Sequence, residues 1–276
     1  MVVKKKYIIS SSELLEKMND KNIKILDSRW FLDPKKNGYN EYIKSHIPNS
    51  VFFDIDLFSD QKTKLPHMMP SDERLKTLAS KIGISNDDHL IIYDQTGFFC
   101  SSRVWFMFKV FGHKKISILN GGFENWKKEK LPLEKNKAKS YISNYLINRK
   151  KNLIVSKDKI LKLMNSNYKN SYSIIDARPL RRFKSLEPEP RKNVRRGNIQ
   201  KSINIPFNII HDKNGFILSN EKLKDIFYNN NKLKSKKVIC LCGSGVTACN
   251  IIFALHLLNH KNNFLYDGSW SEWGAL

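Results

Sequence analysis

A cysteine stands where an apolar strand pattern gives way to a glycine-containing loop. The strand pattern covers Val238–Cys242, and two glycines and two hydroxyl residues follow it within Gly243–Thr247. An apolar helical pattern begins at Ala248, so the loop opens a helix. Backbone N–H groups and the helix dipole at such a position favour negative charge. We therefore expect Cys242 to form a nucleophilic thiolate, and the loop to hold an anionic substrate or leaving group.

The other three cysteines are expected to be structural. Cys240 lies in the apolar strand pattern and Cys249 inside the following helical pattern, where a thiol is a small buried hydrophobe. Cys100 belongs to the first half of the chain. Four cysteines in 276 residues do not form a disulfide framework, so reduced thiols and a cytoplasmic location are expected.

Charge and composition restrict the classes of partner. The formal net charge is +23, but lysine and asparagine are scattered along the chain, so no nucleic-acid partner is expected. No apolar run reaches the roughly 18 residues that cross a membrane, so no membrane partner is expected. The apolar run within Met1–Ser12 is shorter than the roughly 7–15 residues of a secretory signal. His256 and His260 have helical ligand spacing but no evident third ligand, so no metal is expected.

The sequence repeats one plan in two halves. Three landmarks recur in the same order: Asp27-Ser28-Arg29 with Asp176-Ala177-Arg178, Asp94 with Cys242, and Asn120–Trp126 with Asp267–Trp273. Matched positions are 147 to 149 residues apart. The repeat predicts two domains of the same fold, 1–137 and 156–276, joined by a polar linker at 138–155.

Short apolar strands alternate with helical patterns in each half. Ser10 and Glu13 form a capping box, and Ser71 and Ser219 are expected to begin two further helices. This alternation predicts an α/β fold, in which each half is a parallel sheet with helices on both faces.

Ligands of such sheets bind at the carboxyl ends of the strands, where both Cys242 and Asp94 fall. The loop after Asp94 has no thiol at the matching position, since Cys100 comes several residues late. The first domain is therefore expected to be catalytically silent.

With these motifs the sequence resembles the two-domain rhodanese family of sulfurtransferases, and within it the 3-mercaptopyruvate sulfurtransferase branch. The resemblance covers nearly the whole chain and implies two tandem rhodanese-like domains. The segments that carry it are Cys242–Thr247, Arg182-Phe183, Glu187–Arg191, Phe52–Asp56, His67–Pro70, Arg103–Trp105 and Phe111–His113.

The resemblance also implies roles for single residues. Cys242 matches the family's sulfur carrier, which becomes a persulfide. Arg182 and Arg191 match the family's two substrate-binding arginines. Ser244, His67 and Asp56 match its serine, histidine and aspartate, which assist the reaction. One departure, Asn198–Lys201 in place of the usual Gly-His-Ile-Pro-Gly, is expected to change only a turn.

The loop composition favours one sulfur donor. The thiosulfate-using branch typically places basic side chains inside the loop to hold a dianion. Here the expected substrate-binding positions of the loop are Gly243, Gly245, Val246 and Thr247, and none is basic. The resemblance therefore implies 3-mercaptopyruvate as the donor, a thiol such as thioredoxin or cyanide as the acceptor, and no cofactor.

Other interpretations remain beside this one. A thiosulfate sulfurtransferase would use the same cysteine, and a non-catalytic binding module would share the fold. A cysteine-dependent phosphatase would need arginine in place of Ala248, so the sequence excludes it. By residue type alone, Arg182 and Arg191 also fit a solvated basic run, His67 a surface loop and Asp56 a cap.

Overall fold

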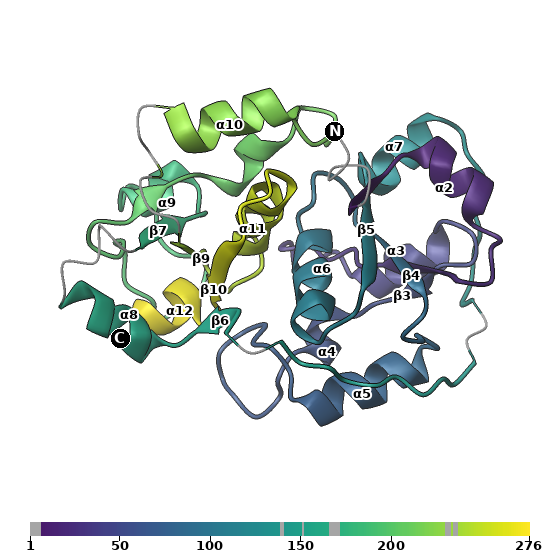
Figure 1. Cartoon of the computed structure of the whole chain (residues 1–276), viewed down its shortest axis with the longest axis horizontal. Helices are drawn as coiled ribbons and strands as arrows, with labels where there is room; N and C mark the ends of the chain where they lie inside the picture. Colours follow the sequence, from purple (N-terminus) through teal and green to yellow (C-terminus); the bar gives the residue numbers. More distant parts are fainter. Residues whose placement is uncertain (1–6, 139–140, 151, 166–171, 230–232, 234–236) are drawn as a thin grey trace. The chain divides into compact units, whose positions relative to one another are not determined.

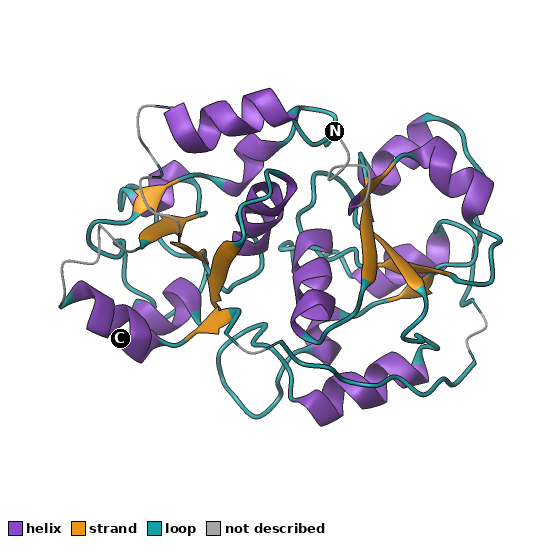
Figure 2. Cartoon of the chain, in the orientation of Figure 1, coloured by secondary structure: helices purple, strands orange, loops and turns teal. Residues whose placement is uncertain are grey.

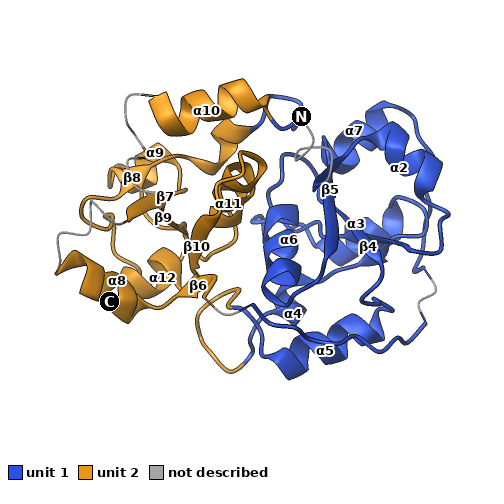
Figure 3. Cartoon of the chain, viewed as in Figure 1, with its two compact units in different colours: residues 1–61, 69–150, 211–217 blue, residues 62–68, 151–210, 218–276 orange. Residues whose placement is uncertain are grey.

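A computed structural model describes residues 7–138, 141–150, 152–165, 172–229, 233 and 237–276. The chain divides into two compact units, which Figure 3 shows in different colours. The first unit comprises residues 1–61, 69–150 and 211–217, and the second comprises residues 62–68, 151–210 and 218–276.

The first unit is built on a parallel sheet of five strands in the order β1-β5-β4-β2-β3 (Figure 1). The strands are β1 (Ile8–Ile9), β2 (Ile23–Asp27), β3 (Val51–Phe52), β4 (His89–Tyr93) and β5 (Lys115–Leu119). The helices are α2 (Ser11–Lys17), α3 (Gly38–Lys44), α4 (Ile55–Phe58), α5 (Asp72–Lys81), α6 (Ser101–Val110) and α7 (Gly122–Lys128). The predicted capping box of Ser10 and Glu13 begins α2, and Ser71 caps α5.

The second unit repeats this sheet in the order β6-β10-β9-β7-β8, again with every pair parallel. Figure 2 shows the strands of both units in orange and the helices in purple. Its strands are β6 (Ile154–Val155), β7 (Ser173–Asp176), β8 (Ile203–Asn204), β9 (Lys237–Leu241) and β10 (Asn262–Tyr266). Its helices are α8 (Lys157–Met164), α9 (Leu180–Phe183), α10 (Asn220–Tyr228), α11 (Ala248–Leu257), α12 (Ser269–Trp273) and the 3₁₀ turn η2 (Phe207–Ile210). The predicted α/β class and the doubled plan are confirmed.

The repeated Asp-x-Arg motif forms the same buried ion pair in both units. Asp27 ends β2 and pairs with Arg29 two residues later, and the guanidinium stacks over the ring of Phe123 at 4.0 Å. Asp176 and Arg178 pair at the end of β7, with Trp270 in the place of the phenylalanine, at 4.3 Å. Each pair fixes a loop at the carboxyl edge of its sheet, where ligands of parallel sheets bind.

Each half of the sequence contributes one short segment to the unit built mainly from the other half. Residues 62–68 belong to the second unit and residues 211–217 to the first, and the two segments are 149 positions apart, which is the spacing of the internal repeat. In the first unit, Ile217 N donates a hydrogen bond to Asn120 Oδ1 at 2.9 Å. A Cβ atom at Gly97 would lie 2.9 Å from the ring of His211. The two segments are therefore equivalent parts of the repeated plan.

Residues 141–150 of the polar segment that sequence analysis assigned to a linker pack along the first unit, and Ile154–Val155 form β6 of the second unit. Tyr145 is buried and its N–H donates to Ser80 Oγ at 2.9 Å, while Asn148 N donates to Phe111 O at 3.1 Å. The boundaries of the domains at 137 and 156 stay a prediction. Among the described residues, no helix has the length and apolar content that a membrane crossing requires.

Candidate active site

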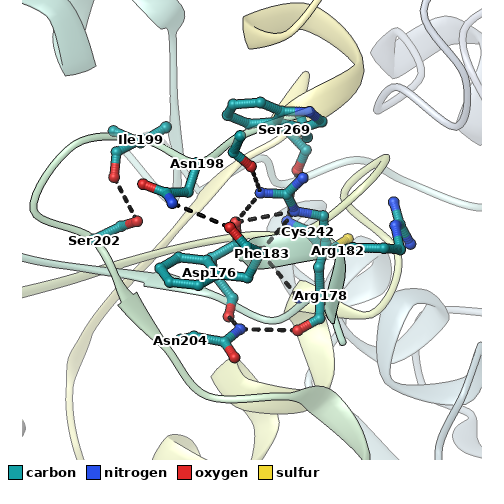
Figure 4. Close-up of polar contacts among 12 residues, drawn as sticks. Asp176, Arg178, Arg182, Phe183, Asn198, Ile199, Ser202, Asn204, Cys242 and Ser269 are labelled. Atoms are coloured by element: carbon teal, nitrogen blue, oxygen red, sulfur yellow. Dashed lines mark hydrogen bonds and ion pairs between the residues drawn. The ribbon is translucent and has the colours of Figure 1, made fainter. Parts of the chain in front are cut away.

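Cys242 follows β9 directly and begins the loop that leads into α11, as the sequence predicts. Its N–H donates to Ser269 Oγ at 3.1 Å, and its carbonyl accepts from Trp270 N at 2.9 Å. Figure 4 shows Cys242 and Ser269 together with Asp176 of β7. Cys242 keeps only 2% of its surface exposed, and its backbone is bonded to the first two residues of α12.

The loop after Cys242 has backbone N–H groups that donate no hydrogen bond within the described part of the chain. Among the described residues, the N–H groups of Gly243, Ser244, Val246 and Thr247 donate to no protein acceptor. Gly245 has a φ of +76°, a left-handed conformation that glycine adopts without strain. Thr247 precedes α11 without a side-chain cap bond. The loop therefore offers donors and a helix N-terminus to an anion.

Arg182 and Arg191 meet at the second residue of this loop. A Cβ atom added to Gly243 would lie 3.1 Å from Arg182 Nη2 and 3.9 Å from Arg191 Nη1. Arg191 Nη2 also donates to Ser244 Oγ at 3.4 Å. Both guanidinium groups thus stand beside the residue that follows the thiol, and a side chain at Gly243 would press on that of Arg182.

His67 approaches the same loop from residues 62–68, the segment of the first half of the sequence that belongs to the second unit. Its Nδ1 lies 3.1 Å from Ser244 Oγ, and the histidine is 7% exposed. Its φ of +58° is a left-handed conformation that is uncommon for a residue with a side chain. The contact makes Ser244 the neighbour of both an imidazole and the Arg191 guanidinium.

Asp56 belongs to the first unit, on the short helix α4. Its carboxylate accepts a hydrogen bond from Trp30 Nε1 at 3.0 Å. The neighbouring Asp54, rather than Asp56, caps the helix through the N–H groups of Asp56 and Leu57. The role of Asp56 as the group that orients His67 stays a prediction.

Glu189 is a member of the site that sequence analysis did not single out. Its Oε1 accepts a hydrogen bond from Arg178 Nη1 at 2.7 Å. Its Oε2 accepts from Arg182 Nε at 3.1 Å and also from Arg182 Nη2. The carboxylate therefore holds one arginine of the predicted donor site against a buried arginine of the fold.

Asp176 completes this network on the other side of Arg178. Arg178 Nη2 pairs with Asp176 Oδ2 at 2.5 Å, and the Asn204 side chain donates to the carbonyls of Asp176 and Arg178 at 2.9 Å each (Figure 4). Burial raises the pKa of Asp176, and the hydrogen bonds and charge of Arg178 oppose that rise. The repeat of the Asp-x-Arg motif was the signal that could have found Arg178 in the sequence.

Two further serines hold the loop and were also missed. Ser269 Oγ accepts from Cys242 N and donates to the carbonyl of Tyr266 at 2.8 Å. Ser271 Oγ donates to the carbonyl of Gly243 at 2.6 Å. Both lie in the second copy of the repeated Asn120–Trp126 landmark, which was the available signal.

Asn198, part of the one departure from the expected family pattern, lies next to the arginine-bearing helix. Its side-chain N–H donates to the carbonyl of Phe183 at 3.1 Å, and Phe183 is the last residue of α9, which carries Arg182 (Figure 4). Ser202 Oγ and N both donate to the carbonyl of Ile199, closing the turn that follows. Asn198 thus ties this turn to the end of α9.

The first unit holds a loop of the same construction with a carboxylate in place of the thiol. The carbonyl of Asp94 accepts from Phe123 N at 2.9 Å, as the carbonyl of Cys242 accepts from Trp270 N. One carboxylate oxygen of Asp94 accepts from the N–H groups of Cys100 and Ser101, at 2.7 and 2.8 Å. The amides at the start of α6 therefore already hold an anion that belongs to the chain.

The remaining cysteines are buried. Cys240 lies in β9, where burial raises the pKa of its thiol well above the ordinary value. Cys249 lies in α11 and its Sγ donates to the carbonyl of Gly245 at 3.3 Å. All four cysteines of the chain are free thiols. Across the described ranges, no group of three or more His, Cys, Asp or Glu residues could hold a metal ion.

Comparison with known proteins gives full-length matches. The family described as "Rhodanese-like domain" matches residues 10–129 and 156–276. A 3-mercaptopyruvate sulfurtransferase of Escherichia coli (strain K12) is 35% identical over 271 residues, which cover 98% of this chain and 95% of the relative. A thiosulfate sulfurtransferase of Rattus norvegicus is 34% identical over 255 residues, which cover 91% and 85%.

A solved structure has the same arrangement of elements. The crystal structure of SseA from Escherichia coli, described as showing the rhodanese fold and catalytic mechanism of 3-mercaptopyruvate sulfotransferases, matches with a TM-score of 0.85 and 34% identity. The match covers 96% of this chain and 98% of that one.

Proposed function

Because this chain belongs to the rhodanese-like family, we propose that it is a sulfurtransferase that takes sulfur from 3-mercaptopyruvate through a persulfide on Cys242. One observation carries the proposal: the guanidinium groups of Arg182 and Arg191 converge on Gly243, the residue after the thiol. A 2-keto acid presents a carboxylate and a ketone oxygen, which planar guanidinium groups bind well. The donor's sulfur is one carbon away from that ketone.

The first half of the reaction transfers sulfur to the enzyme. The Cys242 thiolate attacks the sulfur of the donor, an S–S bond forms, and the C–S bond breaks. The electron pair of the broken bond stays on the carbon as the enolate of pyruvate, while the transferred sulfur remains on Cys242 as a persulfide. The unused N–H groups of the loop support the negative charge near the thiol.

The enolate then needs a proton at its methylene carbon. Ser244 Oγ supplies it and recovers a proton from His67, whose Nδ1 lies 3.1 Å away. Asp56 is assigned the role of orienting the imidazole. In the second half of the reaction, an acceptor such as the thiol of thioredoxin, or cyanide, attacks the outer sulfur and restores the Cys242 thiolate. No metal or organic cofactor takes part in these steps.

The division of labour between the domains is part of the proposal. Residues 156–276 form the catalytic domain, 138–155 the linker, and 1–137 a catalytically silent domain whose corresponding loop holds the Asp94 carboxylate. The four free thiols fit a reducing compartment, and the cytoplasm is the proposed location.

Thiosulfate is the competing donor, since a rat thiosulfate sulfurtransferase is nearly as similar as the Escherichia coli relative. The absence of a basic side chain at Gly243, Ser244, Gly245 and Thr247 favours the monoanionic keto acid over the dianion. Turnover of both donors with one acceptor decides between them. A clear preference for thiosulfate would overturn the assignment of the donor.

Intact-mass measurement after incubation with 3-mercaptopyruvate tests whether the chain is an enzyme of this class at all. We expect wild-type protein to gain the mass of one sulfur atom and Cys242→Ser to gain none. Cys100→Ser is the matched control, because it makes the same change in the corresponding loop of the first unit, and it should gain sulfur normally. No gain by wild-type protein would favour a binding module.

A further inference from the structure

Ser271, in the short helix α12, places two hydrogen bonds on one carbonyl of the thiol loop. Its N–H donates to Gly243 O at 2.9 Å, and its hydroxyl donates to the same oxygen at 2.6 Å. A carbonyl oxygen has two lone pairs and accepts both bonds. Ser271 is 8% exposed, so little water competes for them. The Gly243 carbonyl is therefore held toward α12.

The direction of this carbonyl fixes the direction of an amide. A trans peptide group is planar, and its C=O and N–H point in opposite directions. The peptide between Gly243 and Ser244 therefore turns the Ser244 N–H away from α12. The carbonyl of Cys242 accepts from Trp270 N and turns the Gly243 N–H the same way. Two consecutive amides, which have no acceptor in the described part of the chain, thus face away from α12, an arrangement that suits an anion.

Gly243 is the residue at which this arrangement is most easily lost. Glycine places few steric limits on its backbone angles, so the peptide that follows it can turn over. Turned over, the peptide would present its carbonyl oxygen, the negative end of its dipole, to an anion. A side chain at position 243 would stiffen the loop but would press on Arg182 in the donor site. A bond from outside the loop fixes the peptide without that cost, and Ser271 supplies it.

The corresponding loop of the first unit has the backbone bond but lacks the hydroxyl bond. Glu124 N donates to Gln95 O at 3.0 Å, as Ser271 N does to Gly243 O. The Glu124 carboxylate pairs with Lys127 at 2.9 Å and has no proton to donate to a carbonyl. The backbone bond therefore suffices to build such a loop. Of the two loops, only the one that carries the thiol has the hydroxyl bond.

We propose that the Ser271 hydroxyl positions the Ser244 N–H toward the sulfur of Cys242, where the thiolate and then the persulfide carry negative charge. The inference rests on the proposed function and deepens it, since it names a further residue for the sulfur-transfer step. Ser271 is a positioning residue, because it acts through the peptide that follows Gly243.

Ser271→Ala tests the proposal, because it removes the hydroxyl and keeps the N–H bond to Gly243. Rapid mixing in a single turnover gives the rate of pyruvate release at saturating 3-mercaptopyruvate, and the donor concentration that produces half of it. Removing a group that binds developing charge directly lowers a rate by about 10²–10³. Ser271 acts one step away, so we expect a fall of about tenfold in the rate. The half-saturating concentration should change by less than about twofold, because Arg182 and Arg191 keep their places.

Two further variants separate catalysis from stability. Ser28 N and Oγ both donate to Tyr93 O in the first unit, at 2.8 Å each, so Ser28→Ala also removes one of two bonds to a single carbonyl. This matched control should lower the denaturant midpoint as Ser271→Ala does, and leave the rate of pyruvate release unchanged. Ser271→Thr keeps a hydroxyl on the same carbon, so its rate should lie within about threefold of the wild type.

A wild-type rate in folded Ser271→Ala, or equally low rates in Ser271→Ala and Ser28→Ala, would overturn the inference and leave the proposed function intact. Absence of the persulfide in wild-type protein would instead remove the function itself.

If Ser271→Ala does not fold, the amide proton of Ser244 gives the answer by NMR. We expect its signal to lie further downfield in the persulfide form of the wild type than in Cys242→Ala, because a proton bonded to a negative sulfur is deshielded. Coinciding signals would overturn the inference.

Discussion

Ser244 Oγ lies 3.1 Å from His67 Nδ1, although the two residues are 177 positions apart in the chain. The same hydroxyl accepts a hydrogen bond from Arg191 at 3.4 Å. The thiol loop belongs to the second half of the sequence, and the imidazole beside it belongs to the first half. The second half of the chain alone therefore does not contain all the groups that the proposed reaction uses.

Replacing the imidazole by an amide should slow the protonation of the enolate. We expect His67→Gln to lower kcat for pyruvate formation by about a hundredfold, because Ser244 loses the group that returns its proton. Rapid-mixing measurement of pyruvate release checks this. His211→Gln is the matched control, since His211 lies in the equivalent segment of the first unit against Gly97. Equal rates for wild type and His67→Gln would remove His67 from the mechanism.

A methyl group at the second position of the loop should weaken donor binding. The Cβ of Gly243→Ala would lie 3.1 Å from Arg182 Nη2, so the end of the arginine side chain has to shift by a few tenths of an ångström. We expect KM for 3-mercaptopyruvate to rise about tenfold with a smaller change in kcat. The rate at which Cys242 reacts with an alkylating reagent is the internal control and should hardly change. A KM equal to that of the wild type would contradict the placement of Arg182 at the donor.

The thiol loop and its helix could be predicted because their signals are local. Two glycines, two hydroxyl residues and the apolar period from Ala248 place the turn and the start of α11 without knowledge of the rest of the fold. The Asp-x-Arg motif was likewise one of the repeated landmarks that predicted two domains of one plan, and each copy follows the end of a strand.

The contacts of Glu189 and His67 could not be predicted from local signals. Glu189 lies in a loop without periodicity, and its partners Arg178 and Arg182 are fixed by how that loop packs. The segment of His67 joins the other unit, which is a result of tertiary packing, and only the family resemblance pointed to this histidine. Asn198 shows the same limit, because its bond to Phe183 depends on the position of α9.

The free energy of unfolding should depend on pH because of the titration of Asp94. Burial raises the pKa of this carboxyl to about 6, although the hydrogen bonds from Ser101 and Cys100 lower it. The folded state then binds a proton more tightly than the unfolded state, so the free energy of unfolding falls as the pH rises through about 4 to 6. The full contribution is about 3 kcal/mol.

Denaturant unfolding of wild type and Asp94→Asn between pH 4 and 7 measures that contribution. The amide of Asp94→Asn does not titrate. The unfolding free energy of the wild type minus that of the variant should therefore fall as the pH rises through about 4 to 6. A difference that stays constant over this range would show that Asp94 has an ordinary pKa in the folded protein.

The thiols of Cys240, in β9, and Cys242, in the loop after it, should differ in their reactivity toward alkylating reagents. Burial raises the pKa of Cys240 well above the ordinary value, so at neutral pH it stays protonated and unreactive. We expect Cys240→Ala to leave alkylation of the native protein unchanged and Cys242→Ala to remove its fastest phase. Peptide mapping that finds Cys240 modified before Cys242 would contradict this order.

The transfer of one sulfur atom to Cys242 is the central claim, and the mass of the protein tests it most directly. After brief exposure to 3-mercaptopyruvate and removal of the donor, the chain should be heavier by one sulfur atom, located by peptide mapping on Cys242 and released by a thiol acceptor. An unchanged mass, or sulfur found on another cysteine, would contradict the account.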